Sequence, residues 1–160
     1  MTWIFSLSAE FGERREPADN FAAHYTGMSF AGAPDGLESF VFQDADQGWW
    51  CTLTPRGNRD VKPDSMRPAL ACELLRSLHT SPSFRFALVG EEVGEVRTWL
   101  EALADPSDLP FDGLVLPKQT WDVLGRPEGF VPFGEWGVWR PYPLEPELAT
   151  LALTPLVQTE

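Results

Sequence analysis

The chain has 160 residues, of which 24 are acidic and 12 are basic, so its formal net charge is −12. This length suits one domain with a sizeable core, and a hydrophobic content of 43% argues against intrinsic disorder. The charge excess is larger in the C-terminal half. It disfavours binding to nucleic acid or to anionic membrane surfaces, and it attracts cationic partners.

Compartment and source are inferred from composition. The first residues lack the positive charge and apolar run of a secretory signal, and no segment reaches the roughly 18–20 apolar residues of a membrane span. The two cysteines, Cys51 and Cys72, are expected to be free, buried thiols in a reducing cytoplasm. Ten arginines against two lysines, one isoleucine and two asparagines indicate GC-rich codon usage, from which we expect a bacterial source.

The first elements are read from periodicity and from turn residues. Alternating apolar and polar residues predict a strand over 2–8. A short helix over 21–25, capped by Asp19 or Asn20, follows a polar stretch. Gly, Pro and Asp residues then predict a loop over 32–36.

A β-hairpin is the clearest local signal, with strands over 38–43 and 48–54. The residues between them include Asp44, Asp46 and Gly48, a spacing similar to the start of a calcium-binding loop. The glycine comes one position early, however, and no glutamate closes such a loop. A solvated turn is therefore the better interpretation, because Asp and Gly are ordinary turn residues.

Two amphipathic helices are expected in the middle of the chain, over 65–79 and 91–104, with a strand over 83–89 between them. The later elements are a strand over 113–116, a helix over 117–124, one or two strands within 129–142 and a tail of ambiguous structure over 146–157. One contiguous core is expected to contain Leu70, Leu74, Leu78, Phe84, Phe86, Leu88, Val96, Leu100 and Leu103.

The fold class that these elements predict is α+β, in a single domain over 1–160. Its sheet is expected to be largely antiparallel, with two main helices packed on it. A β-α-β succession over 84–116 would add one parallel pair and make the sheet mixed.

Motifs for catalysis and for cofactors are missing from the sequence. The two histidines, His24 and His79, do not have zinc-ligand spacing, and no phosphate-binding glycine motif or nucleophile motif occurs. We therefore predict no cofactor, no metal site and no catalytic residue. If the chain is an enzyme, His24 near Asp19 is the best candidate for acid–base chemistry.

The candidate binding residues lie in the more acidic C-terminal half. Aromatic side chains gather within 130–142, and Trp, Tyr and Arg are enriched at interface hot spots. Whether this aromatic segment belongs to the core or to the surface is left open by the sequence. The predicted binding residues are Glu91, Glu92, Glu95, Trp136, Trp139, Arg140 and Tyr142.

Three functions follow as hypotheses. The leading one is a protein-binding, inhibitory module, similar in role to an immunity protein, for a cationic partner such as a basic enzyme or toxin. The second is a small hydrolase that uses His24 and carboxylates brought together by the fold. The third is a subunit of a homo-oligomer, in which the aromatic segment forms the contact between subunits.

Overall fold

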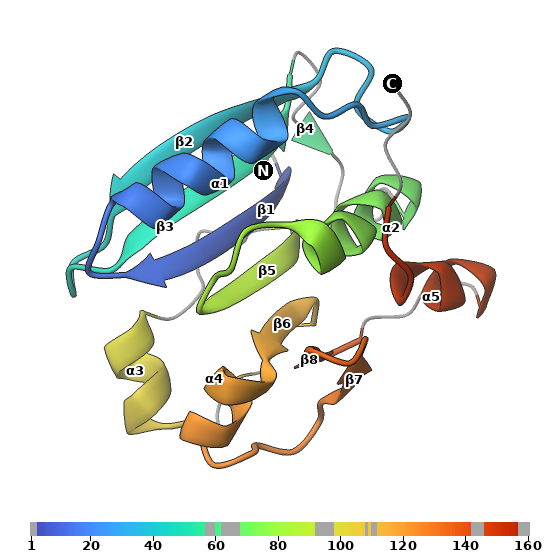
Figure 1. The fold of residues 1–160 in the computed structure, drawn as a ribbon. Helices are drawn as coiled ribbons and strands as arrows, with labels where there is room; N and C mark the ends of the chain where they lie inside the picture. The colour runs from blue at the N-terminus through green and yellow to red at the C-terminus, as the bar shows by residue number, and fades with distance from the viewer. Residues whose placement is uncertain are drawn as a thin grey trace.

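The computed structural model describes residues 3–56, 60–61, 68–91, 98–107, 109, 112–141 and 146–156. Within them the chain forms one sheet of eight strands, covered by helices on both faces (Figure 1). The strands are β1 (Trp3–Gly12), β2 (Leu37–Gln43), β3 (Trp49–Pro55), β4 (Asp60–Val61), β5 (Phe86–Glu91), β6 (Leu114–Pro117), β7 (Val131–Phe133) and β8 (Gly137–Trp139).

The order of the strands is β2-β3-β1-β5-β6-β8-β7, and β4 pairs with the start of β1. Every strand pair among the described residues is antiparallel. This confirms the α+β class and the hairpin at 38–54. Of the two alternatives for the sheet, the described residues show the antiparallel one, because β5 and β6 run antiparallel, with Ala87 opposite Val115.

The helices differ from the prediction in length. They are α1 (Glu16–Thr26), α2 (Pro68–Ser77), α3 (Trp99–Ala104), α4 (Lys118–Val123) and α5 (Pro146–Ala152), and a 3-10 turn η1 (Leu78–Thr80) extends α2. The helix predicted over 21–25 begins earlier, because Pro17 is tolerated in a first turn, and α1 is the longest described helix. The helix expected over 91–104 begins only at Trp99, where Thr98 forms a capping box with Glu101.

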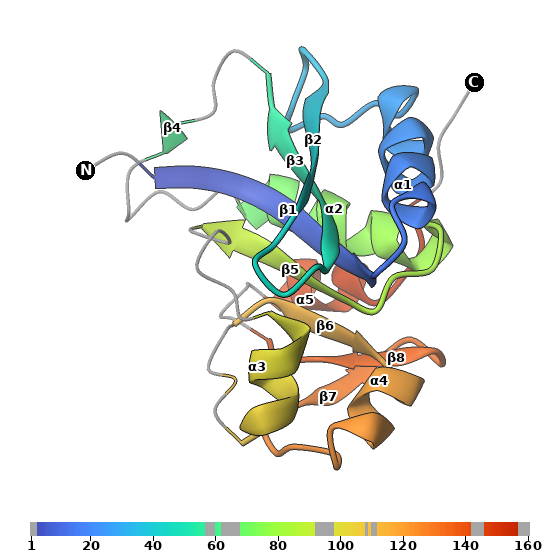
Figure 2. The same ribbon diagram turned by 90° about the vertical axis from the view of Figure 1, so that its left-hand side faces the viewer.

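Two clusters of buried side chains lie on opposite faces of the sheet. The first core packs α1, α2 and α5 against one face, around residues such as Phe21, Leu74 and Phe133. The second core packs α3 and α4 against the other face, around Phe86 and Leu116. Figure 2 shows α1 on one side of the sheet and α3 and α4 on the other. Alternating strand residues therefore find cover on both faces.

The prediction of one contiguous core is wrong in two respects. Leu74 and its helical neighbours belong to the first core, whereas Phe86 and Leu88 belong to the second. Leu100 and Leu103 are 56% and 39% exposed, because α3 turns Trp99 and Ala102 toward the sheet instead. Val96 lies outside the described residues.

Both cysteines are free and buried, as predicted. Cys51 contributes to the sheet and Cys72 to α2, and both belong to the first core. Within the described part of the chain, no helix combines the length and the apolar character that a membrane crossing demands.

Candidate functional site

The aromatic segment predicted for binding contributes mainly to the core. Phe133 and Trp139 are 0% and 3% exposed, so neither offers contact area to a partner. Trp136 is half-buried, and its indole Nε1 donates to Nδ1 of His79 at 2.9 Å. Arg140 donates from Nε to Asp112 at 3.2 Å and from Nη1 to the carbonyl of Leu109 at 3.2 Å.

Of the acidic members of the predicted binding set, only Glu91 lies among the described residues. Glu91 is the last residue of β5 and lies opposite Phe5 of β1. Glu92, Glu95 and Tyr142 lie outside the described residues. Among the described members, Trp139 is buried and so does not contribute to a contact surface.

The side chains considered for catalysis are either hydrogen-bonded to other protein groups, buried, or exposed on a helix. His24 is exposed on α1, where its ring meets the edge of the Tyr25 ring at a centroid distance of 5.3 Å. The Tyr25 hydroxyl is 2.6 Å from the hydroxyl of Ser77, and burial raises the pKa of Tyr25. Burial also raises the pKa of the Cys51 thiol to about 12, which makes it a poor nucleophile. In the described ranges, no three His, Cys, Asp or Glu side chains come close enough to hold a metal ion.

A buried ion pair joins β1 to the start of β5. The Glu10 carboxylate is 0% exposed, accepts from Nε of Arg85 at 2.7 Å and from the amide of Gly12 at 2.9 Å. The Arg85 guanidinium also lies 4.3 Å from the centroid of the Trp99 ring. Burial raises the pKa of Glu10, while the Arg85 charge opposes that rise. Protein groups therefore bond both side chains of the pair, which links β1 to the segment before β5.

The open side of the sheet lies at β2. Among the described residues this strand pairs only with β3. Hydrogen bonds fix the pattern at both ends of the pair: the Arg56 amide donates to Gly36 at 2.9 Å, and the Asp44 amide donates to Gly48 at 2.8 Å. Because hydrogen-bonded pairs alternate along antiparallel strands, the even-numbered backbone groups of β2 face β3. The odd-numbered ones, from Leu37 to Gln43, face outward.

Two large apolar side chains stand beside this open strand. Phe40 and Phe42 are 47% and 44% exposed, and strand alternation places them on one face with Glu38. Phe42 stacks on the buried Trp50, with centroids 6.3 Å apart and rings inclined by 3°. We call the outward backbone of β2, together with Phe40 and Phe42, the β2 edge.

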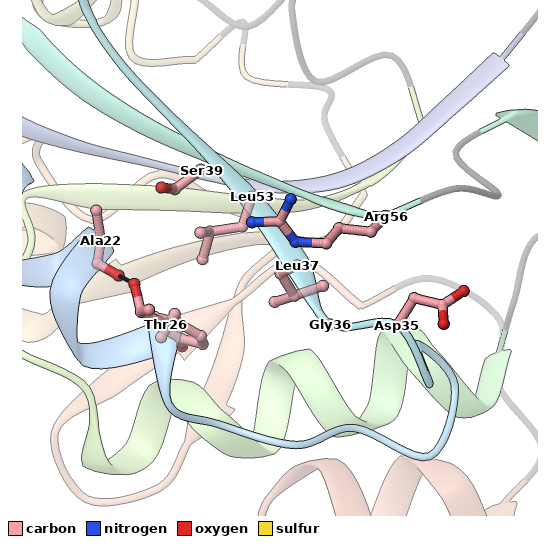
Figure 3. Close-up of a pocket in the computed structure, with 9 residues that line it drawn as sticks. Ala22, Thr26, Asp35, Gly36, Leu37, Ser39, Leu53 and Arg56 are labelled. Atoms are coloured by element: carbon pink, nitrogen blue, oxygen red, sulfur yellow. Dashed lines mark hydrogen bonds between the residues drawn. The ribbon is translucent and has the colours of Figure 1, made fainter.

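A small pocket of about 160 Å³ opens on the opposite face of the same strand (Figure 3). In Figure 3 the side chain of Arg56 extends over Leu37 and Leu53, and Ser39 points toward the same space. The pocket resembles in size a cavity that holds one benzene ring, roughly 150 Å³, and is smaller than the roughly 300–1,000 Å³ of ligand sites. Its lining residues are Ala22, Tyr25, Thr26, Asp35, Gly36, Leu37, Ser39, Leu53 and Arg56.

The turn that leads out of β2 is held rigidly by one carboxylate. Asp44 Oδ1 accepts from the amides of Asp46 and Gly48, each at 2.9 Å, and Oδ2 accepts from Trp50 Nε1 at 2.7 Å. The hydroxyl of Thr98 donates to Asp46, which ties the turn to the start of α3. This confirms the turn predicted at 44–48 and gives the β2 edge a fixed shape.

The hairpin that contains the β2 edge carries more acidic than basic residues. From residue 35 to residue 56 the chain carries four carboxylates, Asp35, Glu38, Asp44 and Asp46, and one cation, Arg56. Arg56 Nη1 lies 3.7 Å from Glu38, and both side chains are partly exposed to solvent. A cationic ligand would therefore meet a favourable field here.

Sequence reasoning missed the β2 edge, because Phe40 and Phe42 served there only as evidence for a strand. The signal that could have revealed it is the spacing of two among Glu38, Phe40, Phe42 and Asp44. This pattern puts Glu38 and two aromatic rings on one face of one strand, with Asp44 in the turn that follows.

Neither the models of known protein families, nor the curated proteins, nor the solved structures yield a significant match to this chain.

Proposed function

We propose that this chain is a protein-binding module for a cationic partner, acting as an inhibitor in the manner of an immunity protein, and that it binds through the β2 edge. The observation that carries this proposal is the pair Phe40 and Phe42, exposed on an open strand within an acidic hairpin. Exposed aromatic rings supply binding energy when a partner covers them. The acidic chain, including its C-terminal half, attracts a basic partner over a longer range.

The hydrolase hypothesis receives less support. The pocket beside β2 has room for one side chain, and the hydroxyl of Tyr25, one of its lining residues, is engaged with Ser77. His24 does not line that pocket. A binding role for the pocket therefore fits its size and its lining better than a catalytic role.

Self-association through the β2 edge is opposed by charge. Two copies would bring together two hairpins that each carry four acids and one base. Like charges at a contact are unfavourable.

We also retain the cytoplasm as the proposed compartment, since free, buried thiols suit reducing conditions.

Site-specific photo-crosslinking in the source cells tests this proposal. Phe40 is replaced by photoreactive p-benzoylphenylalanine in one variant, and Val123, which is 57% exposed on α4, is replaced in a control. The expected result is an adduct with one basic protein from position 40 and no such adduct from position 123. The proposal is wrong if position 40 yields no adduct, an adduct with a second copy of the chain, or the same adducts as position 123.

A further inference from the structure

We infer that the partner binds as an additional β-strand alongside β2, through an extended segment with Arg or Lys at every second position. This inference rests on the proposed function and specifies its mode. In such strand addition, main-chain hydrogen bonds supply affinity, and pockets for alternate side chains supply specificity. The β2 edge offers both kinds of contact.

The backbone of β2 is suited to pairing. The amides and carbonyls of Leu37, Ser39, Val41 and Gln43 face outward in the register set by the hairpin. Proteins commonly protect such edges with proline, lysine, bulges or very short strands. The other end of the described sheet follows this rule, because β7 has three residues and includes Pro132. In contrast, β2 has seven residues with neither proline nor lysine.

The even-numbered face of β2 indicates which side chains the added strand carries there. Phe40 and Phe42 present exposed rings, and acidic residues precede and follow them at Glu38 and Asp44. A guanidinium or ammonium group is attracted to an aromatic face and to a nearby carboxylate alike. Alternate residues of the added strand that lie over this face are therefore cationic.

The odd-numbered face receives the residues in between. Ser39 and Leu37 point to the pocket between α1 and the hairpin, and Arg56 lies over it. A second guanidinium is unfavourable beside Arg56, whereas one apolar side chain fits the pocket volume. The expected pattern is therefore a cation on one face alternating with an apolar residue on the other.

Two synthetic peptides of about nine residues, enough to span β2 at roughly 3.3 Å per residue, serve as probes. One alternates Arg with Val, and the other alternates Glu with Val. The Arg–Val peptide is also made in two N-methylated forms, one methylated at the Val amides and one at the Arg amides. Alternate residues of a strand direct their amides to opposite sides, so for either strand direction only one of the two amide sets points toward β2. The form methylated at the other set is therefore the control.

A matched pair of variants tests the protein side. Ser39→Pro removes an outward amide at an exposed edge position, where proline is tolerated, and Ser39→Ala keeps that amide. Equal far-UV spectra and melting temperatures check that both variants fold. We expect Ser39→Pro to weaken Arg–Val binding about tenfold, as loss of a hydrogen bond does, and Ser39→Ala to retain it within about twofold.

Strand addition is supported if one methylated peptide loses binding while the other keeps it, and if Ser39→Pro loses binding as well. If the Arg–Val peptide binds but neither methylation nor Ser39→Pro changes its affinity, strand addition is wrong, and the proposed binding of a cationic partner is unaffected. If the Glu–Val peptide binds as well as the Arg–Val peptide, or if neither peptide binds, the inference is wrong. Equal binding of the Glu–Val peptide would also contradict the charge argument for the proposed function.

Discussion

Arg85 holds the buried carboxylate of Glu10 with two hydrogen bonds, from Nε to Oε1 at 2.7 Å and from Nη2 to Oε2 at 2.5 Å. The Glu10 side chain is fully buried, whereas 29% of the Arg85 side chain reaches solvent. Trp99 of α3 covers the guanidinium at 4.3 Å. One pair thus links β1, the start of β5 and a helix of the second core.

Removing only the cation of this pair is expected to destabilise the fold strongly. Arg85→Met leaves a buried carboxylate without its partner, and the free energy of unfolding should fall by about 3–5 kcal/mol. The double variant Glu10→Leu with Arg85→Met should recover much of that loss, because no charge stays buried. Urea denaturation of all variants measures both effects. Equal losses in the single and double variants would contradict this account of the pair.

The two cores predict opposite outcomes for two leucines. Leu74 is 0% exposed in the first core, so Leu74→Ala should cost about 2–5 kcal/mol of unfolding free energy. Leu100 is 56% exposed on α3, so Leu100→Ala should change that free energy by only about 0.5 kcal/mol. Denaturant titration of the two variants provides the comparison. Similar losses at both positions would mean that the buried face of α3 is assigned incorrectly.

The His79 ring is expected to make stability depend on pH. Its Nε2 donates to the carbonyl of Ala152 at 2.9 Å, and its Nδ1 accepts from Trp136 at 2.9 Å. Both bonds together require a neutral ring. Burial lowers the pKa of His79 from 6.5. The contribution of His79 is therefore complete above about pH 6.5 and is lost as the pH falls through the lowered pKa of the folded state.

His79→Phe provides the matched variant, because it keeps a ring beside Phe133, on which His79 stacks at 4.4 Å. The difference in unfolding free energy between wild type and variant should shrink between about pH 7 and pH 5. Burial raises the pKa of Glu10, so ionisation of its carboxyl lowers the unfolding free energy as the pH rises, which is opposite to the effect of His79. Both proteins contain Glu10, so its effect cancels in the difference between wild type and variant. A constant difference over this range would show that the pKa of His79 is the same in the folded and unfolded states, and would contradict the lowered pKa.

Much of the sheet could be predicted from the sequence because its strands alternate in a regular way and its turn uses Asp and Gly. The strands predicted over 2–8, 38–43, 48–54 and 83–89 all appear, with bounds shifted by a few residues. The buried face of α3 could not be predicted in the same way. Its apolar residues surround the helix, and Thr98 decides where the helix starts and hence which side packs.

The site was less accessible to sequence reasoning, because burial depends on partners that are distant along the chain. The sequence leaves open whether Trp139 and Phe133 lie in the core or at the surface, and both enter the first core against other elements. Phe40 and Phe42 look like ordinary strand residues, and they are exposed because β2 ends the sheet. Strand order therefore decided which aromatic residues face solvent, and strand order is not encoded locally.

Charge near the β2 edge should affect how fast a cationic peptide binds. Asp35→Lys reverses a charge beside the pocket, whereas Glu128→Lys makes the same change in net charge in the turn before β7. Stopped-flow measurements with the Arg–Val peptide should show slower association and weaker salt dependence for Asp35→Lys than for Glu128→Lys. If the two variants associate at equal rates, local steering at this edge is refuted.

Backbone amide exchange within β2 tests the central claim most directly. The odd-numbered amides from Leu37 to Gln43 face outward, while Glu38, Phe40 and Phe42 already pair with β3 and act as internal controls. Nuclear magnetic resonance follows the exchange of each amide with and without the cationic partner. The account predicts that the partner slows exchange at Ser39 and Val41 and leaves the even-numbered amides nearly unchanged. Uniform slowing along the strand, or no slowing at the odd positions under saturating partner, would contradict binding by strand addition.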